Sequence, residues 1–165
     1  MHRSVVERLV ADEAQALAAA VVAGRLKRIE RRGTLLVAEF SHAVYAAARF
    51  GQSGTAVPLL GQRRESTVVA TLACDHYDTD PPSVAFVADW QATAELPFAA
   101  WPKGPAVVER HHDTGKPFLC WPGVREFHTH VQHSDEPWDR FRGRVRPRDL
   151  VLRLADELRS RMIHV

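Results

Sequence analysis

Residues 66–88 read STVVATLACDHYDTDPPSVAFVA, two apolar runs on either side of a break that ends in Pro81 and Pro82. Short runs of β-branched and apolar residues bounded by Asp, Gly and Pro predict strands. Such runs lie at 26–30, 34–40, 43–50, 66–74 and 83–88. Because the connections between these runs are too short for crossover helices, the pattern predicts a four-stranded antiparallel meander from about residue 25 to about residue 90.

A helix is predicted on each side of this sheet. Residues 4–23 place apolar side chains at helical spacing, and Gly24 follows them as a stop signal. Pro147 occupies a position typical of a helix start. One apolar stripe follows it: Leu150, Val151, Leu154, Leu158 and Met162. The sequence therefore predicts a single α+β domain over residues 1–165, with a Cys- and His-rich segment at 111–138.

Composition narrows the class of protein. Of the 165 residues, 45% are hydrophobic and 25% are charged, and the net charge is +2, as in an ordinary globular domain. No run approaches the roughly 20 apolar residues that span a membrane, and the N-terminal residues lack the apolar core of a signal peptide. Cys74 and Cys120 are the two cysteines, which excludes a disulfide framework and favours the cytoplasm. Cys74 lies in an apolar run and is expected in the core.

An alternating basic stripe follows the Cys/His segment, formed by Arg140, Arg142, Arg144, Arg146 and Arg148. We interpret it as a solvated edge that resists strand pairing. The alternative is a docking surface for an acidic partner or a nucleic acid. We expect neither a membrane nor a nucleic acid as partner.

The densest chemistry lies in residues 120–133, CWPGVREFHTHVQH. Three potential metal ligands occupy alternate positions: Glu126, His128 and His130. Side chains at positions i, i+2 and i+4 of a strand project from one face. If residues 126–131 are extended, these groups point the same way, and the Pro-Gly turn after Cys120 folds the thiolate over them. One thiolate, one carboxylate and two or three imidazoles, the third from His133, fit zinc.

Zinc is the expected metal, and iron or nickel is the alternative because imidazole and carboxylate suit them too. If Cys120, Glu126, His128 and His130 all bind, the shell is closed and the site is structural. If Glu126 does not bind the metal directly, a water molecule takes the open coordination position, and Glu126 serves as the general base for that water. The competing interpretation is that these histidines form a solvated strand face, because isolated histidines are usually surface residues.

Three local motifs and the order of the predicted elements are similar to a known enzyme fold. Residues 80–86 (DPPSVAF) are similar to the segment with which a strand of that fold begins. Residues 115–120 (GKPFLC) are similar to the residues that precede its catalytic cysteine, and Trp138 lies downstream of Cys120, where such enzymes often have a tryptophan. In this respect the chain resembles the ubiquitin-conjugating enzymes. The resemblance implies their fold and, as an alternative function, an enzyme that carries a ubiquitin-like protein as a thioester on Cys120. His112 stands where those enzymes have an asparagine that supports the oxyanion, a role that a histidine can also fill.

A second resemblance rests on the Cys/His segment itself. Its motif comprises Cys120, residues 122–126, His128, His130, His133 and residues 135–138. This motif is similar to a predicted metal-binding family named for its Cys, Glu, His, His signature. Members of that family are encoded beside bacterial ubiquitin-like conjugation genes. The chain departs from the pattern at Val131 and Gln132, where a proline is expected, and this affects the placement of His133.

The second resemblance implies a metal-binding accessory of a bacterial ubiquitin-like pathway, with a ubiquitin-like protein or its activating enzyme as partner. This is the function that we expect. It competes with the thioester alternative for Cys120, because a metal-bound thiolate is a poor acyl carrier. A non-catalytic binding module, with neither metal nor thioester, is the third hypothesis.

Overall fold

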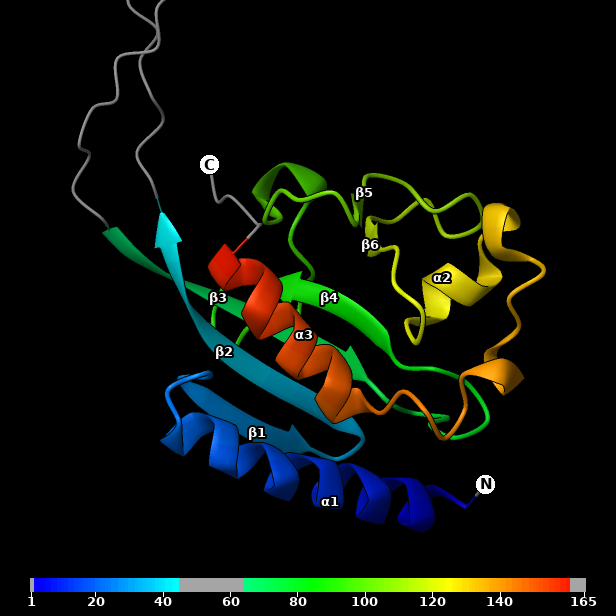
Figure 1. The fold of residues 1–165 in the computed structure, drawn as a ribbon, viewed down its shortest axis with the longest axis horizontal. Coiled ribbons are helices and arrows are strands. Elements are labelled where there is room, and N and C mark those ends of the chain that lie inside the picture. Colours follow the sequence, from blue (N-terminus) through cyan, green and yellow to red (C-terminus); the bar gives the residue numbers. More distant parts are fainter. Residues whose placement is uncertain (1, 45–63, 161–165) are drawn as a thin grey trace, which may run out of the picture.

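The computed structural model describes residues 2–44 and 64–160 (Figure 1). Its main sheet has the strand order β1 (Arg28–Arg32), β2 (Leu35–Val44), β3 (Arg64–Ala73), β4 (Ser83–Val87), and every neighbouring pair is antiparallel. Helix α1 (Arg3–Val22) precedes the sheet, and helix α3 (Pro147–Ser160) follows it. The predicted meander and both predicted helices are confirmed. Most of the predicted strand at 43–50, and Met162, lie outside the described residues.

The two helices pack against the sheet and against each other. Helix α3 lies across one face of the sheet over β2, and α1 runs beside β1 (Figure 1). Helix α1 ends at Val22, and Gly24 follows it with a φ of +70°, which favours glycine, and an N–H that donates to Val21 O at 3.0 Å. Helix α3 begins with Pro147, and the Asp149 carboxylate accepts a hydrogen bond from the Arg146 N–H at 2.9 Å. The C-terminal end of α1 and the N-terminal end of α3 are therefore set by the residues that flank them.

The core lies between the sheet and the two helices α1 and α3. Alternate residues of β2, β3 and β4 point toward α3 and are fully buried: Leu36, Ala38, Phe40, Ala70, Leu72, Val84 and Phe86. The stripe of α3 from Leu150 to Leu158 covers them, and Trp101 packs edge-on against Phe86 with ring centroids 4.8 Å apart. Cys74 is fully buried in the same core, as its apolar neighbours predict. The alternation of period two thus sets which strand residues face α3.

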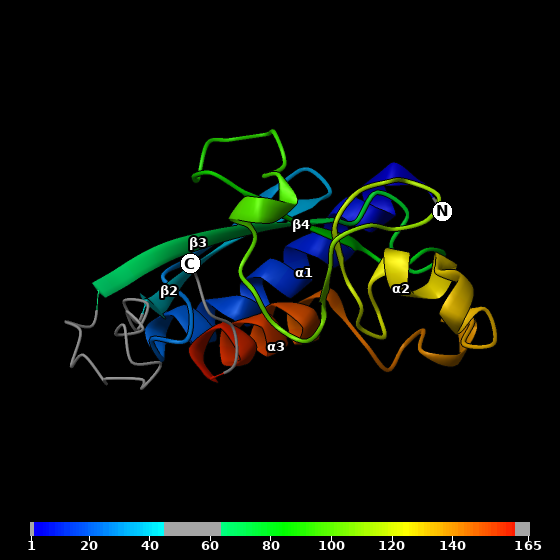
Figure 2. The same ribbon diagram turned by 90° about the horizontal axis from the view of Figure 1, so that it is seen from above.

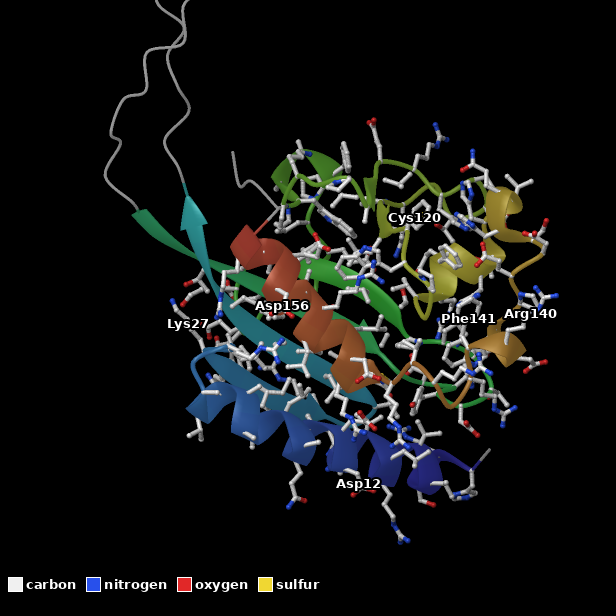
Figure 3. The ribbon with its side chains drawn as sticks, viewed as in Figure 1. Asp12, Lys27, Cys120, Arg140, Phe141 and Asp156 are labelled. Atoms are coloured by element: carbon white, nitrogen blue, oxygen red, sulfur yellow. The ribbon has the colours of Figure 1, made fainter. Side chains whose placement is uncertain are left out.

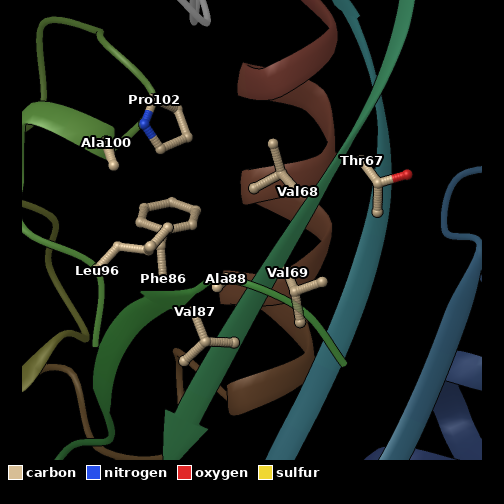
Figure 4. Close-up of a pocket in the computed structure, with 9 residues that line it drawn as sticks. All are labelled: Thr67, Val68, Val69, Phe86, Val87, Ala88, Leu96, Ala100 and Pro102. Atoms are coloured by element: carbon tan, nitrogen blue, oxygen red, sulfur yellow. The ribbon is translucent and has the colours of Figure 1, made fainter. Parts of the chain in front are cut away.

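The opposite face of the sheet carries a smaller apolar cluster around Val37, Val69 and Val87, against which Trp90 packs. Near the end of β4, the chain leaves a cavity of about 290 Å³ whose lining includes Val68, Phe86, Leu96 and Pro102 (Figure 4). Its nine lining residues include no group that titrates or ligates a metal.

Part of the basic stripe is tied into the fold through a buried carboxylate. Glu13 of α1 is only 3% exposed. Its oxygens lie 3.5 Å from an Arg146 nitrogen and 3.8 Å from an Arg148 nitrogen, and one accepts the Arg148 N–H at 3.2 Å. A buried carboxylate needs such partners to offset its lost hydration. Arg142 forms an ion pair with Asp78 at 2.8 Å. These arginines thus fasten the start of α3 and the segment before it.

The Cys/His segment and the residues that flank it form an irregular region, and its Leu119, Trp121 and Val124 are buried in the main core. Strands β5 (Val107–Val108) and β6 (Phe118–Leu119) form a short antiparallel hairpin, followed by helix α2 (Arg125–Thr129) and the 3-10 turns η2 (Val131–His133) and η3 (Trp138–Arg140). Seen from above, this region lies beside the sheet rather than over it (Figure 2). It is anchored where the Arg125 N–H donates to Pro82 O at 2.9 Å, next to the start of β4.

The prediction that residues 126–131 are extended is wrong, because they form α2 and η2. Local side-chain bonds favour the helical turns. His128 Nε2 accepts the Gly123 N–H at 3.0 Å, and His130 Nδ1 accepts the Gln132 N–H at 3.3 Å. Such bonds from a side chain to a nearby backbone group compete with strand formation. Side chains that were expected on one strand face are therefore spread around a helix.

Candidate functional site

Cys120 lies at the end of the hairpin, between the second sheet and α2 (Figure 3). Its N–H donates to Ala106 O at 2.8 Å, which continues the pairing of β5 and β6. The chain then turns at Gly123, whose φ is +96°. A Cβ there would also collide with the Val145 side chain. The turn between Cys120 and α2 thus requires glycine on two counts, backbone conformation and close packing.

A chain of three polar groups begins at the Cys120 thiol. Its Sγ lies 3.3 Å from His133 Nε2, and His133 Nδ1 lies 3.4 Å from a Glu136 carboxylate oxygen. Because an ionised carboxylate only accepts hydrogen bonds, Nδ1 carries the proton and Nε2 presents its lone pair to the thiol. The His133 ring stacks on Phe127 with centroids 3.9 Å apart. The imidazole is therefore fixed in position and in tautomer.

The surroundings of Cys120 do not favour its thiolate. Partial burial, and then the negative charge of Glu136, raise the pKa of the Cys120 thiol above its ordinary value. Reactive cysteines have the opposite shift, produced by nearby positive charge. The thiol stays protonated at neutral pH unless a cation replaces its proton.

Two of the predicted ligands are engaged elsewhere. The Glu126 carboxylate bonds to the Ser83 hydroxyl through Oε1, and Oε2 is buried without a hydrogen-bond partner. His128 uses both ring nitrogens, since Nε2 accepts from Gly123 and Nδ1 donates to Glu136 O at 2.7 Å. Burial lowers the pKa of His128, so that the ring is neutral. His128 cannot bind a metal in this arrangement without losing one of these bonds, whereas Glu126 could do so only through its buried Oε2.

His130 lies between the Cys120–His133 pair and the hairpin loop. Its ring stacks on Phe118 with centroids 5.4 Å apart, and it lies 6.2 Å from the His133 ring, 5.3 Å from that of His112 and 5.6 Å from that of His111. Desolvation, followed by the neighbouring imidazoles, lowers the pKa of His130. Because Nδ1 accepts the Gln132 N–H, the neutral ring carries its proton on Nε2, and His130 can bind a metal only by giving up that bond.

His112 lies in the loop of the hairpin, whereas Cys120 lies at its opposite end. Its Nε2 is 3.1 Å from Asp113 Oδ1. The geometry thus groups His112 with Asp113 and His111. It brings Cys120 together with His133 and Glu136. Glu136 lies within the motif at residues 135–138, but the sequence predicts no part in the site for it, because an acidic residue in a surface turn carries no signal of its own.

The comparisons with known proteins add no family to this picture. No family model matches the chain, and no curated protein is similar to it. Within the part of the chain that the structure describes, no helix is long and apolar enough to cross a membrane.

Proposed function

We propose that this protein binds a transition-metal ion, preferentially zinc, through Cys120 and His133. The observation that carries the proposal is the 3.3 Å separation of Cys120 Sγ and His133 Nε2. With bonds of about 2.3 Å to sulfur and about 2.1 Å to nitrogen, two ligands of one tetrahedral zinc lie about 3.5 Å apart. The pair thus has nearly the spacing of two adjacent zinc ligands.

The surroundings of the pair fit a metal centre. A ligating histidine usually donates its other ring N–H to a carboxylate, and Glu136 stands in that position behind His133. His130 offers a further neutral imidazole, which would have to exchange its 3.3 Å bond from the Gln132 N–H for the metal. A bound cation would also replace the thiol proton, which the protein alone does not favour losing. Glu126 and His128 are better explained as residues that hold the shape of the segment.

The biological setting that we propose is an accessory role in a bacterial ubiquitin-like conjugation pathway. It is supported by the resemblance of the motif and by the order of the elements. The helix, four-stranded meander, hairpin, cysteine and final helix follow one another as in the ubiquitin-conjugating enzymes. The partner would be a ubiquitin-like protein or its activating enzyme.

Elemental analysis of the untagged protein tests the metal centre. After desalting at neutral pH we expect zinc to be retained by the wild type and lost from Cys120→Ser and His133→Ala. His76→Ala is the matched control, since it removes an exposed histidine outside the segment. Equal zinc in all four proteins, or none in the wild type, would exclude the proposed centre.

A second candidate, a thioester-forming conjugating enzyme, is favoured by the same thiol–imidazole–carboxylate chain. Cys120 Sγ would attack the carbonyl carbon of the activating enzyme's thioester while His133 Nε2 accepts the thiol proton. The activating enzyme's cysteine would leave as a thiolate, and the acyl group would then reside on Cys120. The raised pKa of the Cys120 thiol makes this the weaker candidate. Incubation with an activating enzyme, ATP and a ubiquitin-like protein, followed by a non-reducing gel, would reveal the adduct.

A further inference from the structure

The hairpin loop contains a histidine whose tautomer is fixed by the fold. His111 is 1% exposed. Its Nε2 lies 3.2 Å from the Thr129 hydroxyl, and that hydroxyl donates its single hydrogen to Arg125 O. The hydroxyl can therefore only accept from His111, so Nε2 carries the proton and Nδ1 presents a lone pair. That lone pair meets only a long contact, 3.4 Å, from the Asp113 N–H.

Two exposed ligands stand next to this buried one. The side chains of His112 and Asp113 are 41% and 64% exposed, and His112 Nε2 lies 3.1 Å from Asp113 Oδ1. Ligand atoms from His111, His112 and Asp113 all lie within 4.8 Å of one another. With bonds of about 2.1 Å, two ligands at right angles on one metal are about 3 Å apart. Small rotations of the exposed side chains would bring the three ligand atoms to the spacing of ligands on one metal ion.

The backbone of the loop holds these three residues in place. The His111 N–H donates to Lys116 O at 2.8 Å, and the Gly115 N–H donates to His111 O at 2.9 Å. Gly115 has a φ of +68°, which lets the loop close tightly. His111 also packs edge-on against Phe118 with centroids 5.2 Å apart. Three consecutive ligands are thus presented by a closed loop with one member anchored in the interior.

We propose that His111, His112 and Asp113 form a second divalent transition-metal site, independent of Cys120 and His133. Two imidazoles and one carboxylate bind iron, cobalt, nickel and zinc, and leave coordination positions open for water or an exogenous ligand. The His130 ring lies 5.3 Å from that of His112, next to the proposed site. Thr129 is a positioning residue, because it sets the His111 tautomer without contacting the ion.

Cobalt(II) titration of the untagged, metal-stripped protein separates the two sites. A cobalt ion bound to Cys120 shows thiolate-to-metal charge-transfer absorption, whereas one bound to imidazole and carboxylate shows only weak d–d bands. For the wild type we expect two equivalents to bind, one with charge transfer and one without. The double variant His112→Ala/Asp113→Asn should lose the equivalent without charge transfer and keep the other.

The controls make each failure recognisable. The pair His76→Ala/Asp12→Asn removes one exposed histidine and one exposed aspartate elsewhere, and should bind both equivalents. Thr129→Val should weaken the second site by about tenfold or more, and Thr129→Ser should restore it. Two equivalents in His112→Ala/Asp113→Asn, or a single charge-transfer equivalent in the wild type, would overturn the second site alone. Cobalt binding without any charge transfer would instead overturn the centre at Cys120.

Discussion

The sheet with its helices and the Cys/His segment are held together in different ways. In the first region, side chains such as Phe86 and Leu154 are buried by the regular alternation of strands and the stripe of a helix. The second contributes Leu119, Trp121 and Val124 to the same core, but its irregular backbone is fixed by individual hydrogen bonds, such as those of His128 to Gly123 and Glu136. Stability should therefore depend mainly on the first region and metal binding on the second.

The largest effect is expected in the core. Phe86→Ala removes a fully buried ring that packs on Trp101, and should lower the free energy of unfolding by about 3–5 kcal/mol. Denaturant titration measures this loss. The zinc content of the folded fraction should not change, because Phe86 belongs to the other region. A loss of zinc from a Phe86→Ala protein that still folds would show that metal binding also depends on the sheet and its helices.

Metal removal should have the next largest effect. A ligand present at 100 times its dissociation constant stabilises the folded state by about 2.7 kcal/mol. For a chain of this size that corresponds to a fall of roughly 5–10 °C in melting temperature on chelation. Thermal unfolding of protein loaded with one equivalent of zinc measures the shift. Cys120→Ser should lose most of this shift. A full shift in that variant would show that the metal is not bound at Cys120.

The contrast between the regions also explains what the sequence could predict. The meander and both helices follow from repeated patterns in which many residues agree, such as the stripe from Leu150 to Leu158. The expected strand at 126–131 rested on three alternating residues, and the hydrogen bonds that His128 and His130 accept from nearby backbone N–H groups outweighed it. The pairing of Cys120 with His133 depends on the turn at Gly123 and the stacking on Phe127, which no periodicity encodes. A site built from single contacts has no repeating signal.

Glu126 distinguishes the sequence-based ligand set from the observed geometry. Glu126→Ala leaves Ser83 without its partner and should lower the free energy of unfolding by about 1–3 kcal/mol. Because this carboxylate bonds to Ser83, zinc retention should match that of the wild type. Elemental analysis combined with denaturant titration measures both properties. Zinc loss as complete as in Cys120→Ser would show that Glu126 is a ligand, as the sequence predicted.

Glu136 should have a smaller effect, confined to the metal. Glu136→Gln keeps the size of the side chain but weakens the carboxylate–imidazole bond to His133. Loss of such a supporting partner typically weakens metal binding by about 10–100-fold. Competition with a chelator of known affinity measures the change. An affinity equal to that of the wild type would show that His133 is not held through Glu136 when the metal is bound.

Alkylation of Cys120 by iodoacetamide tests the central claim most directly. Cys74 serves as an internal control within the same chain, because it is fully buried and its burial raises the pKa of its thiol to about 12. With the modified residues mapped by mass spectrometry, Cys120 should react slowly in the zinc-loaded protein and several-fold faster after chelation, while Cys74 stays unmodified in both. Equal rates at Cys120 with and without zinc, or a stable ester with a ubiquitin-like protein trapped on Cys120→Ser, would contradict the account.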